Sequence, residues 1–503
     1  MQRRWTKWPA AISLPALMRD HGTPPAPDLR ADALAPSPPS RRGAGVWSTL
    51  RDAVRGGEHD FTTGSIDRAI ALLAIPMVME MLMESLFVVV DVFWVSRLGA
   101  DAVAAVGLTE SLLALVYAIA MGLAVAASAT VARRVGEGRH EEAAAMAGQA
   151  IVLGLLISLP ISAVGALLAS RLLAAMGATP GVIAIGAPFA SIMLLGNATI
   201  LMLFVINAIF RGAGDAALSM RVLWLSNALN MALGPCLIFG LGPFPELGVA
   251  GAAVGTTLGR GTGVALQVFF LTRGSGRVRV RARHLVPDPA ALAALLRLFA
   301  NGALQNVIGM ASWSGLVRII APFGSAALAG YTIGMRVIVF AILPALGLSN
   351  AAATLVGQNL GAGRPDRAEA AVYRAGIWTT VMLGAVGVAF AVGAGAIVGA
   401  FTDDAEVLRF GTQTLRILSC GFLFYGFGLV FTQAFNGAGD TWTPTLLNFV
   451  CFWLWEIPLA WGLAGAAGLG PAGVFVAIAA AFSTLAVAGG LVFRRGAWKL
   501  RRV

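Results

Sequence analysis

Three acidic residues, Glu80, Glu84 and Asp91, interrupt a long apolar run of the sequence from position 69 to position 96. They are spaced by four and seven residues, and eleven residues make just over three turns of an α-helix, so all three share one face. A carboxylate facing lipid costs ~2.5–3.5 kcal/mol, so each acid needs a proton, a cation or an arginine partner. The shared face predicts one cavity or groove lined by all three acids. Hydrogen bonds to neighbouring helices are the alternative.

Two further acids lie inside apolar runs. Glu110 is near the outer end of the second run, where water reaches it. Glu456 stands in NFVCFWLWEIPLAW, together with Trp453 and two other tryptophans, and Pro458 loosens the helix beside it. A carboxylate among aromatic rings attracts an organic cation. A tryptophan belt at the membrane interface explains the same residues without a ligand.

The composition indicates a polytopic membrane protein. Of 503 residues, 58% are hydrophobic and 12% are charged, whereas soluble domains carry about 25% charged residues. The net charge of +11 does not indicate nucleic-acid binding, because the arginines gather at the ends of apolar runs, as topology signals do. The three cysteines and four histidines show no metal-ligand spacing, so we expect no metal site or cofactor.

Twelve apolar runs predict an all-α fold with twelve transmembrane helices. Lys and Arg concentrate in alternate connections, which predicts that both termini are cytoplasmic, in the plasma (inner) membrane. The runs span roughly 68–97, 102–132, 142–169, 182–210, 215–240, 249–272, 290–320, 326–356, 367–398, 406–435, 442–465 and 470–493.

The two halves of the chain repeat one another. The segment GLAVAASATVARRVGEGR (122–139) matches GLSNAAATLVGQNLGAGR (347–364) at 8 of 18 positions, and FRGAGD and FNGAGD recur at the same offset of 225 residues. We therefore predict two parallel six-helix bundles, an N-terminal lobe over 61–275 and a C-terminal lobe over 276–503, which suits a transporter whose halves rock about a central site. Residues 1–60 are rich in proline and arginine, and we expect a disordered cytoplasmic tail there.

The repeated motifs G-x-G-R and G-A-G-D are typical of helix ends. Glycine tolerates positive φ in a turn, and an aspartate at the start of a helix caps it. We expect these motifs to shape hairpins rather than bind substrate. Their residues are Gly136, Arg139, Gly212, Asp215, Gly361, Arg364, Gly437 and Asp440.

The motifs VVVDVFWVSRLGADAVAAVGL, MGLAVAASATVARRVGEGR and FRGAGD, in this order, resemble the MATE family (multidrug and toxic compound extrusion), closer to its DinF-like branch. The resemblance runs over residues 65 to 495. It implies two six-helix lobes forming a V and export of organic cations or drugs by antiport against H⁺ or Na⁺. It also implies that Asp91 couples cation binding to transport, with Na⁺ near it if sodium is the coupling ion.

The family's fifth-helix pattern is matched by Asn230 and Pro235, but Gly234 stands where an acid is often found. We expect Glu456, or the other acids of the first helix, to take its place. At the offset of the repeat Asp91 falls on Leu316, so it is a specialisation of the first half. The residues predicted to line the cavity or bind substrate are Glu80, Glu84, Asn230, Gln305, Glu456 and Trp453.

Two other functions differ in what they require. A flippase for a lipid-linked or amphipathic substrate needs a larger and more basic cavity, whereas the embedded charges here are mostly acidic. An enzyme needs a nucleophile–base pair, a metal site or a phosphate loop, and the sequence has none. We expect a monomer that binds a small cationic substrate and does not bind nucleic acid.

Overall fold

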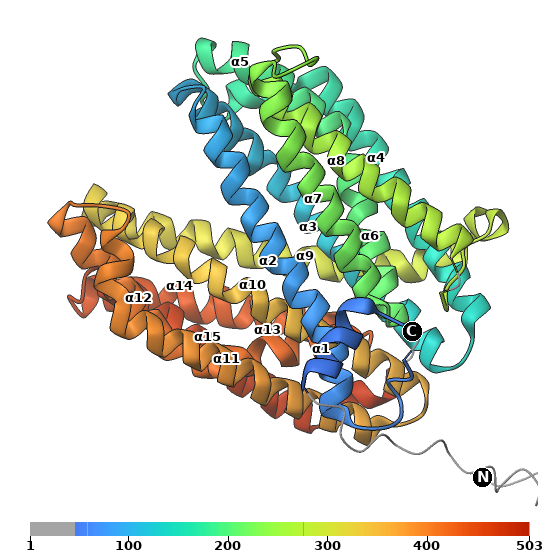
Figure 1. Cartoon of the computed structure of the whole chain (residues 1–503). Helices are drawn as coiled ribbons and strands as arrows, with labels where there is room; N and C mark the ends of the chain where they lie inside the picture. Colours follow the sequence, from blue (N-terminus) through green and yellow to red (C-terminus); the bar gives the residue numbers. More distant parts are fainter. Residues whose placement is uncertain (1–45, 58, 275, 502–503) are drawn as a thin grey trace, which may run out of the picture. The chain divides into compact units, whose positions relative to one another are not determined.

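The computed structural model describes residues 46–57, 59–274 and 276–501 (Figure 1). This part of the chain is helical and contains no strand. The helices of the first half are α1 (Val46–Arg55), α2 (Ile66–Ser96), α3 (Ala100–Gly136), α4 (His140–Ala175), α5 (Pro180–Leu195), α6 (Asn197–Ala213), α7 (Ala216–Phe239) and α8 (Val249–Arg273). Those of the second half are α9 (Pro289–Ile320), α10 (Ser325–Gly361), α11 (Pro365–Gly399), α12 (Ala405–Gly437), α13 (Trp442–Asn448), α14 (Ile457–Trp461) and α15 (Pro471–Arg494).

The predicted twelve-span α-helical fold is confirmed. Within the described residues, ten helices are long and apolar enough to cross a membrane, and the bent pair α5–α6 makes an eleventh span. The twelfth is α8, which is less apolar because its middle carries glycine, threonine and Arg260.

The predicted disordered tail is wrong at its end. Residues 1–45 lie outside the described part of the chain, but Val46–Arg55 form the helix α1. Asp52 of α1 binds Arg68 of α2 at 3.1 Å, and Ala53 is buried. The prolines that suggested disorder end before this helix begins.

Two predicted spans are not single straight helices. The run 182–210 is broken at Gly196, where α5 and α6 meet at 41°. Asn197, fully buried, donates hydrogen bonds from its side chain to the Ser158 carbonyl oxygen and the Ser162 hydroxyl of α4, which hold the break in place. The run 442–465 changes into π-helix over Phe449–Glu456 and again over Gly462–Ala466, on either side of the Pro458 turn, where a backbone N–H is missing.

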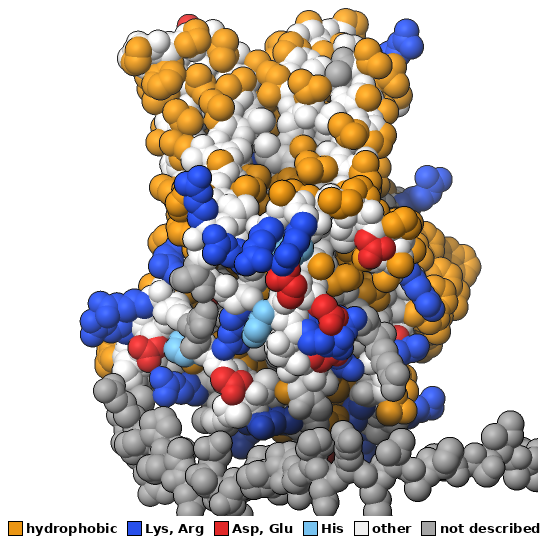
Figure 2. All heavy atoms as spheres, turned by 90° about the vertical axis from the view of Figure 1, so that its right-hand side faces the viewer, with side chains coloured by type: hydrophobic (Ala, Val, Ile, Leu, Met, Phe, Trp, Pro, Cys, Tyr) orange, Lys and Arg blue, Asp and Glu red, His pale blue; other side chains and the backbone are white. Residues whose placement is uncertain are grey.

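The helices form two bundles that contact each other at one end. The first half of α2, including Ile70 and Leu73, packs in the same apolar core as α10, α11 and α12, although the sequence places it in the N-terminal lobe. The inner halves of α3 and α9 also touch, because Gly122 leaves room for the backbone at Ala303. Lys and Arg side chains gather over this end on the face shown in Figure 2, while the opposite end of that face is mostly hydrophobic.

The contacts between the bundles follow the offset of the repeat. Gly136 at the end of α3 lies against the Gln358 carbonyl of α10, and Gly361 of α10 lies against the Arg133 carbonyl of α3. Position 361 is position 136 plus 225, and position 133 is position 358 minus 225. Each contact is therefore the equivalent of the other with the two bundles exchanged. At these two glycines a side chain would overlap the backbone of the other bundle, so glycine is required for the close approach.

The turns after these helices have the expected conformations. Gly138 and Gly363 have φ of +72° and +67°, the left-handed region that glycine adopts freely. Asp215 caps α7 by accepting a hydrogen bond from the Leu218 backbone N–H at 3.2 Å. Asp440 instead accepts from the Thr443 hydroxyl and pairs with Arg501.

Candidate functional site

A central cavity of about 350 Å³ lies between the two bundles. It is lined by residues of α2, α3, α6, α7 and α8 from the first bundle and of α9, α10 and α12 from the second. Its polar and charged lining residues are Glu80, Glu84, Tyr117, Ser128, Asn207, Arg211, Arg260, Gln305, Asn306, Asn350, Thr354, Gln433 and Asn436.

Glu80 is held by a buried ion pair. Its side chain is 2% exposed and receives a hydrogen bond from Arg211 Nη1 at 2.9 Å. The Ser219 hydroxyl lies 3.3 Å from the other carboxylate oxygen and also donates to Asn207 Oδ1. Glu80 is therefore bound to neighbouring helices by hydrogen bonds, which was the alternative to a free acid lining a cavity. Its partner Arg211 belongs to the FRGAGD motif, whose arginine the sequence suggested only as a cytoplasmic topology signal.

Glu84 lies one turn further along α2 and has a neutral partner. Its carboxylate accepts a hydrogen bond from Asn227 Nδ2 at 3.0 Å, and no ion pair to it occurs within the described residues. A carboxylate without an arginine of its own, at the wall of a cavity, retains most of its capacity to bind a cation.

Arg260 of α8 faces the same cavity. Its guanidinium is buried, donates to the Tyr117 hydroxyl at 2.8 Å and interacts electrostatically with both Glu84 and Asp91. Its Nη1 atom is buried without a hydrogen-bond partner in the described structure. The embedded charges of the sequence are mostly acidic, but the cavity wall is not, because Arg211 and Arg260 line it together with the two glutamates.

Asp91 lies on the same face of α2 but not in the cavity lining. Seven residues beyond Glu84 correspond to about 10 Å along the helix axis, so a shared face does not place the acids at one depth. Asp91 is half-buried and makes no hydrogen bond or ion pair with any described residue; its charged neighbours are Glu110 and Arg260. Glu110 itself is exposed, as its place near the helix end suggested.

The other predicted site residues separate into two groups. Gln305 lines the cavity, and its Oε1 atom is buried without a partner among the described residues. Asn230 is buried against Gly259 of α8 and is not a lining residue. Gly234 has open space where a side chain would project. No neighbouring side chain occupies the position of the acid that the family pattern places there.

Glu456 is buried away from the central cavity. It accepts a hydrogen bond from the Ser312 hydroxyl of α9 at 2.9 Å, and its side chain is 3% exposed. Trp453 donates its indole N–H to the Ile308 carbonyl, while Trp461 is 70% exposed. The tryptophans therefore face outward and the carboxylate inward, which favours the interfacial belt over a cation site lined by aromatic rings.

Comparison with known proteins follows this architecture closely. The family model MatE matches residues 76–236 and 298–461, one match in each half. The chain is 27% identical over 446 residues to the probable multidrug resistance protein YoeA of Bacillus subtilis, covering 87% of this chain and 96% of that protein. It is 24% identical over 402 residues to an FAD transporter of Shewanella oneidensis, covering 80% and 89%.

A solved structure shares the fold over nearly the whole chain. It is a MOP superfamily transporter from Pyrococcus furiosus, which aligns with a TM-score of 0.82 and 26% identity over 88% of this chain and 98% of that one. Another structure with the same scores is described as the outward-facing conformation of a multidrug resistance MATE family transporter. With two matching halves, twelve spans and a cavity between the bundles, the chain belongs to the MatE (multidrug and toxic compound extrusion) family of membrane transporters and is not an enzyme.

Proposed function

We propose that this transporter exports small organic cations through the central cavity, in exchange for H⁺ or Na⁺. The observation that carries the proposal is Glu84, a carboxylate at the cavity wall whose only hydrogen-bonding partner in the described structure is a neutral amide. The relatives named multidrug resistance proteins support export of organic molecules. In this proposal the transporter is a monomer in the plasma (inner) membrane. Its basic end and both termini face the cytoplasm.

Arg260 supplies a physical link between the coupling ion and the substrate. Its charge acts on both Asp91 and Glu84. When Asp91 binds H⁺ or Na⁺ and loses its charge, the guanidinium acts on Glu84 alone, and Glu84 holds a cationic substrate less strongly. Substrate and ion thereby oppose each other's binding, which is the condition for antiport.

Efflux assays with matched acid variants test this scheme. In everted vesicles, D91N and E84Q should reduce export of ethidium about 5- to 150-fold, the usual range of a coupling free energy. E406Q removes an exposed acid that does not line the central cavity and should transport normally. Separate pH and sodium gradients identify the ion. Undiminished ethidium export by D91N at normal expression would exclude Asp91 as the coupling residue.

A second function is favoured by one observation, the two arginines in the cavity wall. Arg211 and Arg260 could hold an anionic head group, as a flippase for a lipid-linked or amphipathic substrate requires. Proteoliposomes decide between the two functions. Ethidium uptake without translocation of a fluorescent phospholipid supports cation export, and the opposite result supports the flippase.

A further inference from the structure

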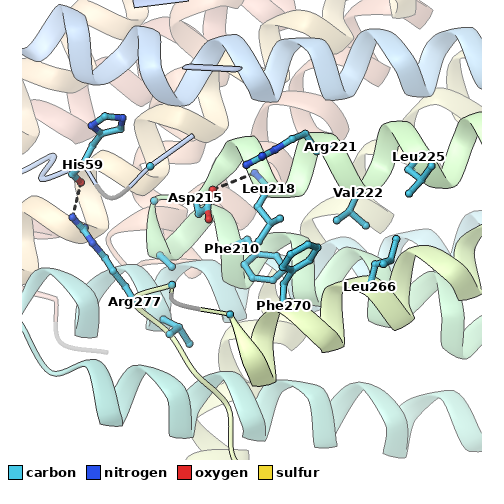
Figure 3. A pocket seen from close by; sticks show the side chains of 16 residues that line it. His59, Phe210, Asp215, Leu218, Arg221, Val222, Leu225, Leu266, Phe270 and Arg277 are labelled. Atoms are coloured by element: carbon cyan, nitrogen blue, oxygen red, sulfur yellow. Dashed lines mark hydrogen bonds between the residues drawn. The ribbon is translucent and has the colours of Figure 1, made fainter. Parts of the chain in front are cut away.

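A second cavity, of about 500 Å³, lies at the basic end of the first bundle. It is bordered by the α6–α7 turn, the first turns of α7 and the last turns of α8, together with Gly57 and His59 before α2 and Gly276 and Arg277 after α8. None of its lining residues lines the central cavity. Figure 3 shows its labelled side chains in order, with His59 and Arg277 at one end and Leu225 and Leu266 at the other.

One end of this second cavity is rich in hydrogen-bond donors. Arg277 donates one N–H to the His59 carbonyl at 2.7 Å, and Arg221 donates one to the Ala217 carbonyl at 3.2 Å. Each guanidinium has five N–H groups. The His59 Nε2 atom is buried without a hydrogen-bond partner in the described structure. Asp215 also lines this end and is the acid among these polar groups.

Burial, more than the neighbouring charges, disfavours a protonated His59 at this end. The pKa of His59 is lowered, first by burial and then by the charge of Arg68, with a smaller contribution from Arg277. Asp52 and Asp215 oppose this shift without reversing it.

The other end of the second cavity is apolar and open to the surface of the bundle. Its walls are Val222, Leu225, Leu266 and Phe270, of which Leu225 is 53% and Phe270 37% exposed. These residues lie one to three helical turns inward from the helix ends, where a transmembrane bundle meets hydrocarbon. The cavity is therefore cationic at its membrane-surface end and apolar toward the membrane interior.

We infer that the second cavity binds an anionic phospholipid of the leaflet at the basic end. Its phosphate would lie between Arg221 and Arg277, and one acyl chain would follow Leu225 and Leu266. Basic pockets between transmembrane helices bind lipid head groups in this way. A soluble anion would leave the apolar end of the cavity unfilled, and a lipid without net charge would leave the charge of the arginines uncompensated.

A lipid in this cavity would act on the contact between the bundles. The segment that carries His59 continues to Phe61, whose carbonyl accepts a hydrogen bond from Asn359 of α10, and to Gly64, whose carbonyl accepts from Arg367 of α11. The last turn of α6, whose Ala213 lines the cavity, carries Arg211, the partner of Glu80. Lipid binding therefore stabilises the conformation in which the basic ends of the bundles touch. This role does not depend on which substrate is exported.

Native mass spectrometry of the full-length protein tests the inference. The protein is titrated with phosphatidylglycerol and, separately, with phosphatidylcholine. Wild type should retain phosphatidylglycerol preferentially, and R221Q/R277Q should weaken that binding by at least about fivefold, the effect of a single basic residue near the surface. R273Q/R281Q removes the arginine at the end of α8 and one in the connection that follows, neither of which lines the cavity, and should bind as wild type does.

Three results would overturn the assignment. They are equal retention of both lipids by wild type, unchanged phosphatidylglycerol binding by R221Q/R277Q, and an equal loss in R273Q/R281Q. Glycerophosphoglycerol and inorganic phosphate separate a lipid from a free anion, because either binding as tightly as the whole lipid would exclude a role for the acyl chain. L225S, which leaves both arginines in place, should weaken the lipid and not phosphate, and it keeps the test valid if R221Q/R277Q fails to fold.

Discussion

At the scale of single residues, the wall of the central cavity contains buried charges, and Glu80 is neutralised there by an ion pair with Arg211. Glu80 and Arg211 come from positions 131 residues apart and meet at 2.9 Å inside the protein. Such a pair is not itself strongly stabilising, because desolvation offsets the attraction, but a lone buried charge is costly.

A double-mutant cycle on this pair should show strong coupling. E80Q or R211M alone leaves one buried charge unpaired and should lower the free energy of unfolding by roughly 3–5 kcal/mol. The double variant E80Q/R211M should be more stable than R211M. Thermal unfolding in detergent measures all four proteins. Additive effects of the two substitutions would mean that the ion pair does not form.

Glu137 should make stability depend on acid pH. Burial alone would raise its pKa, but the hydrogen bond from Arg134 and the charges of Arg134 and Arg139 outweigh burial and lower the pKa below 4.5. Its contribution to stability is present above the unfolded value and is lost as pH falls through the lower folded value. The melting temperature of wild type should therefore fall below pH ~4.5 more steeply than that of E137Q.

The control for this pH dependence is E142Q. Glu142 contacts the same two arginines, but half of its side chain is exposed. E142Q should retain the wild-type slope. Equal slopes for E137Q and wild type would contradict the role of Glu137.

The sequence could predict which acids are embedded, but it could not predict their partners. Glu80 and Glu84 were found because a charge in an apolar run is conspicuous. Arg211 was missed because an arginine at the end of a span is the usual topology signal, and only the fold turns it toward Glu80. The depth of Asp91 was also missed, since a helical face specifies a direction and not a level.

At the scale of elements, the paired glycines of α3 and α10 decide how closely the bundles approach. G136A or G361A would place a methyl group in the backbone of the facing helix, an overpacking that costs roughly 1–3 kcal/mol. We expect the basic ends of the bundles to separate. Spin labels on the exposed positions 140 and 366 should report a longer distance in either variant.

G107A is the matched control for the glycine variants. Gly107 is also inside α3, but its side-chain direction meets open space. The label distance should stay that of wild type in G107A. An unchanged distance in G136A as well would show that α3 and α10 can adjust locally.

The positions of the transmembrane spans could be predicted from the length of the apolar runs, whereas the break and the π-helical turns within two of them could not. The break at Gly196 requires Asn197 to find its partners on α4, and the π-helical turns near Pro458 depend on packing against α9 and α15. Hydropathy contains no information on either contact, so both runs were predicted as straight helices.

At the scale of the whole molecule, the arginines predict sidedness. A fluorescent protein fused after residue 501 should fluoresce, because the basic end and the C-terminus face the cytoplasm in the proposed orientation. A fusion truncated after Leu469, at the other end of the last hairpin, should be dark. The reverse pattern would invert the proposed topology.

The reciprocal contacts of Gly136 with Gln358 and of Gly361 with Arg133 have a consequence for the symmetry of the molecule. Exchange of partners by a fixed offset is the signature of an isologous interface, the kind that two identical subunits form about a two-fold axis. The present chain contains such an interface inside one polypeptide. The contact between the bundles is therefore itself part of the repeat, whereas Asp91, which falls on Leu316 at the same offset, departs from it.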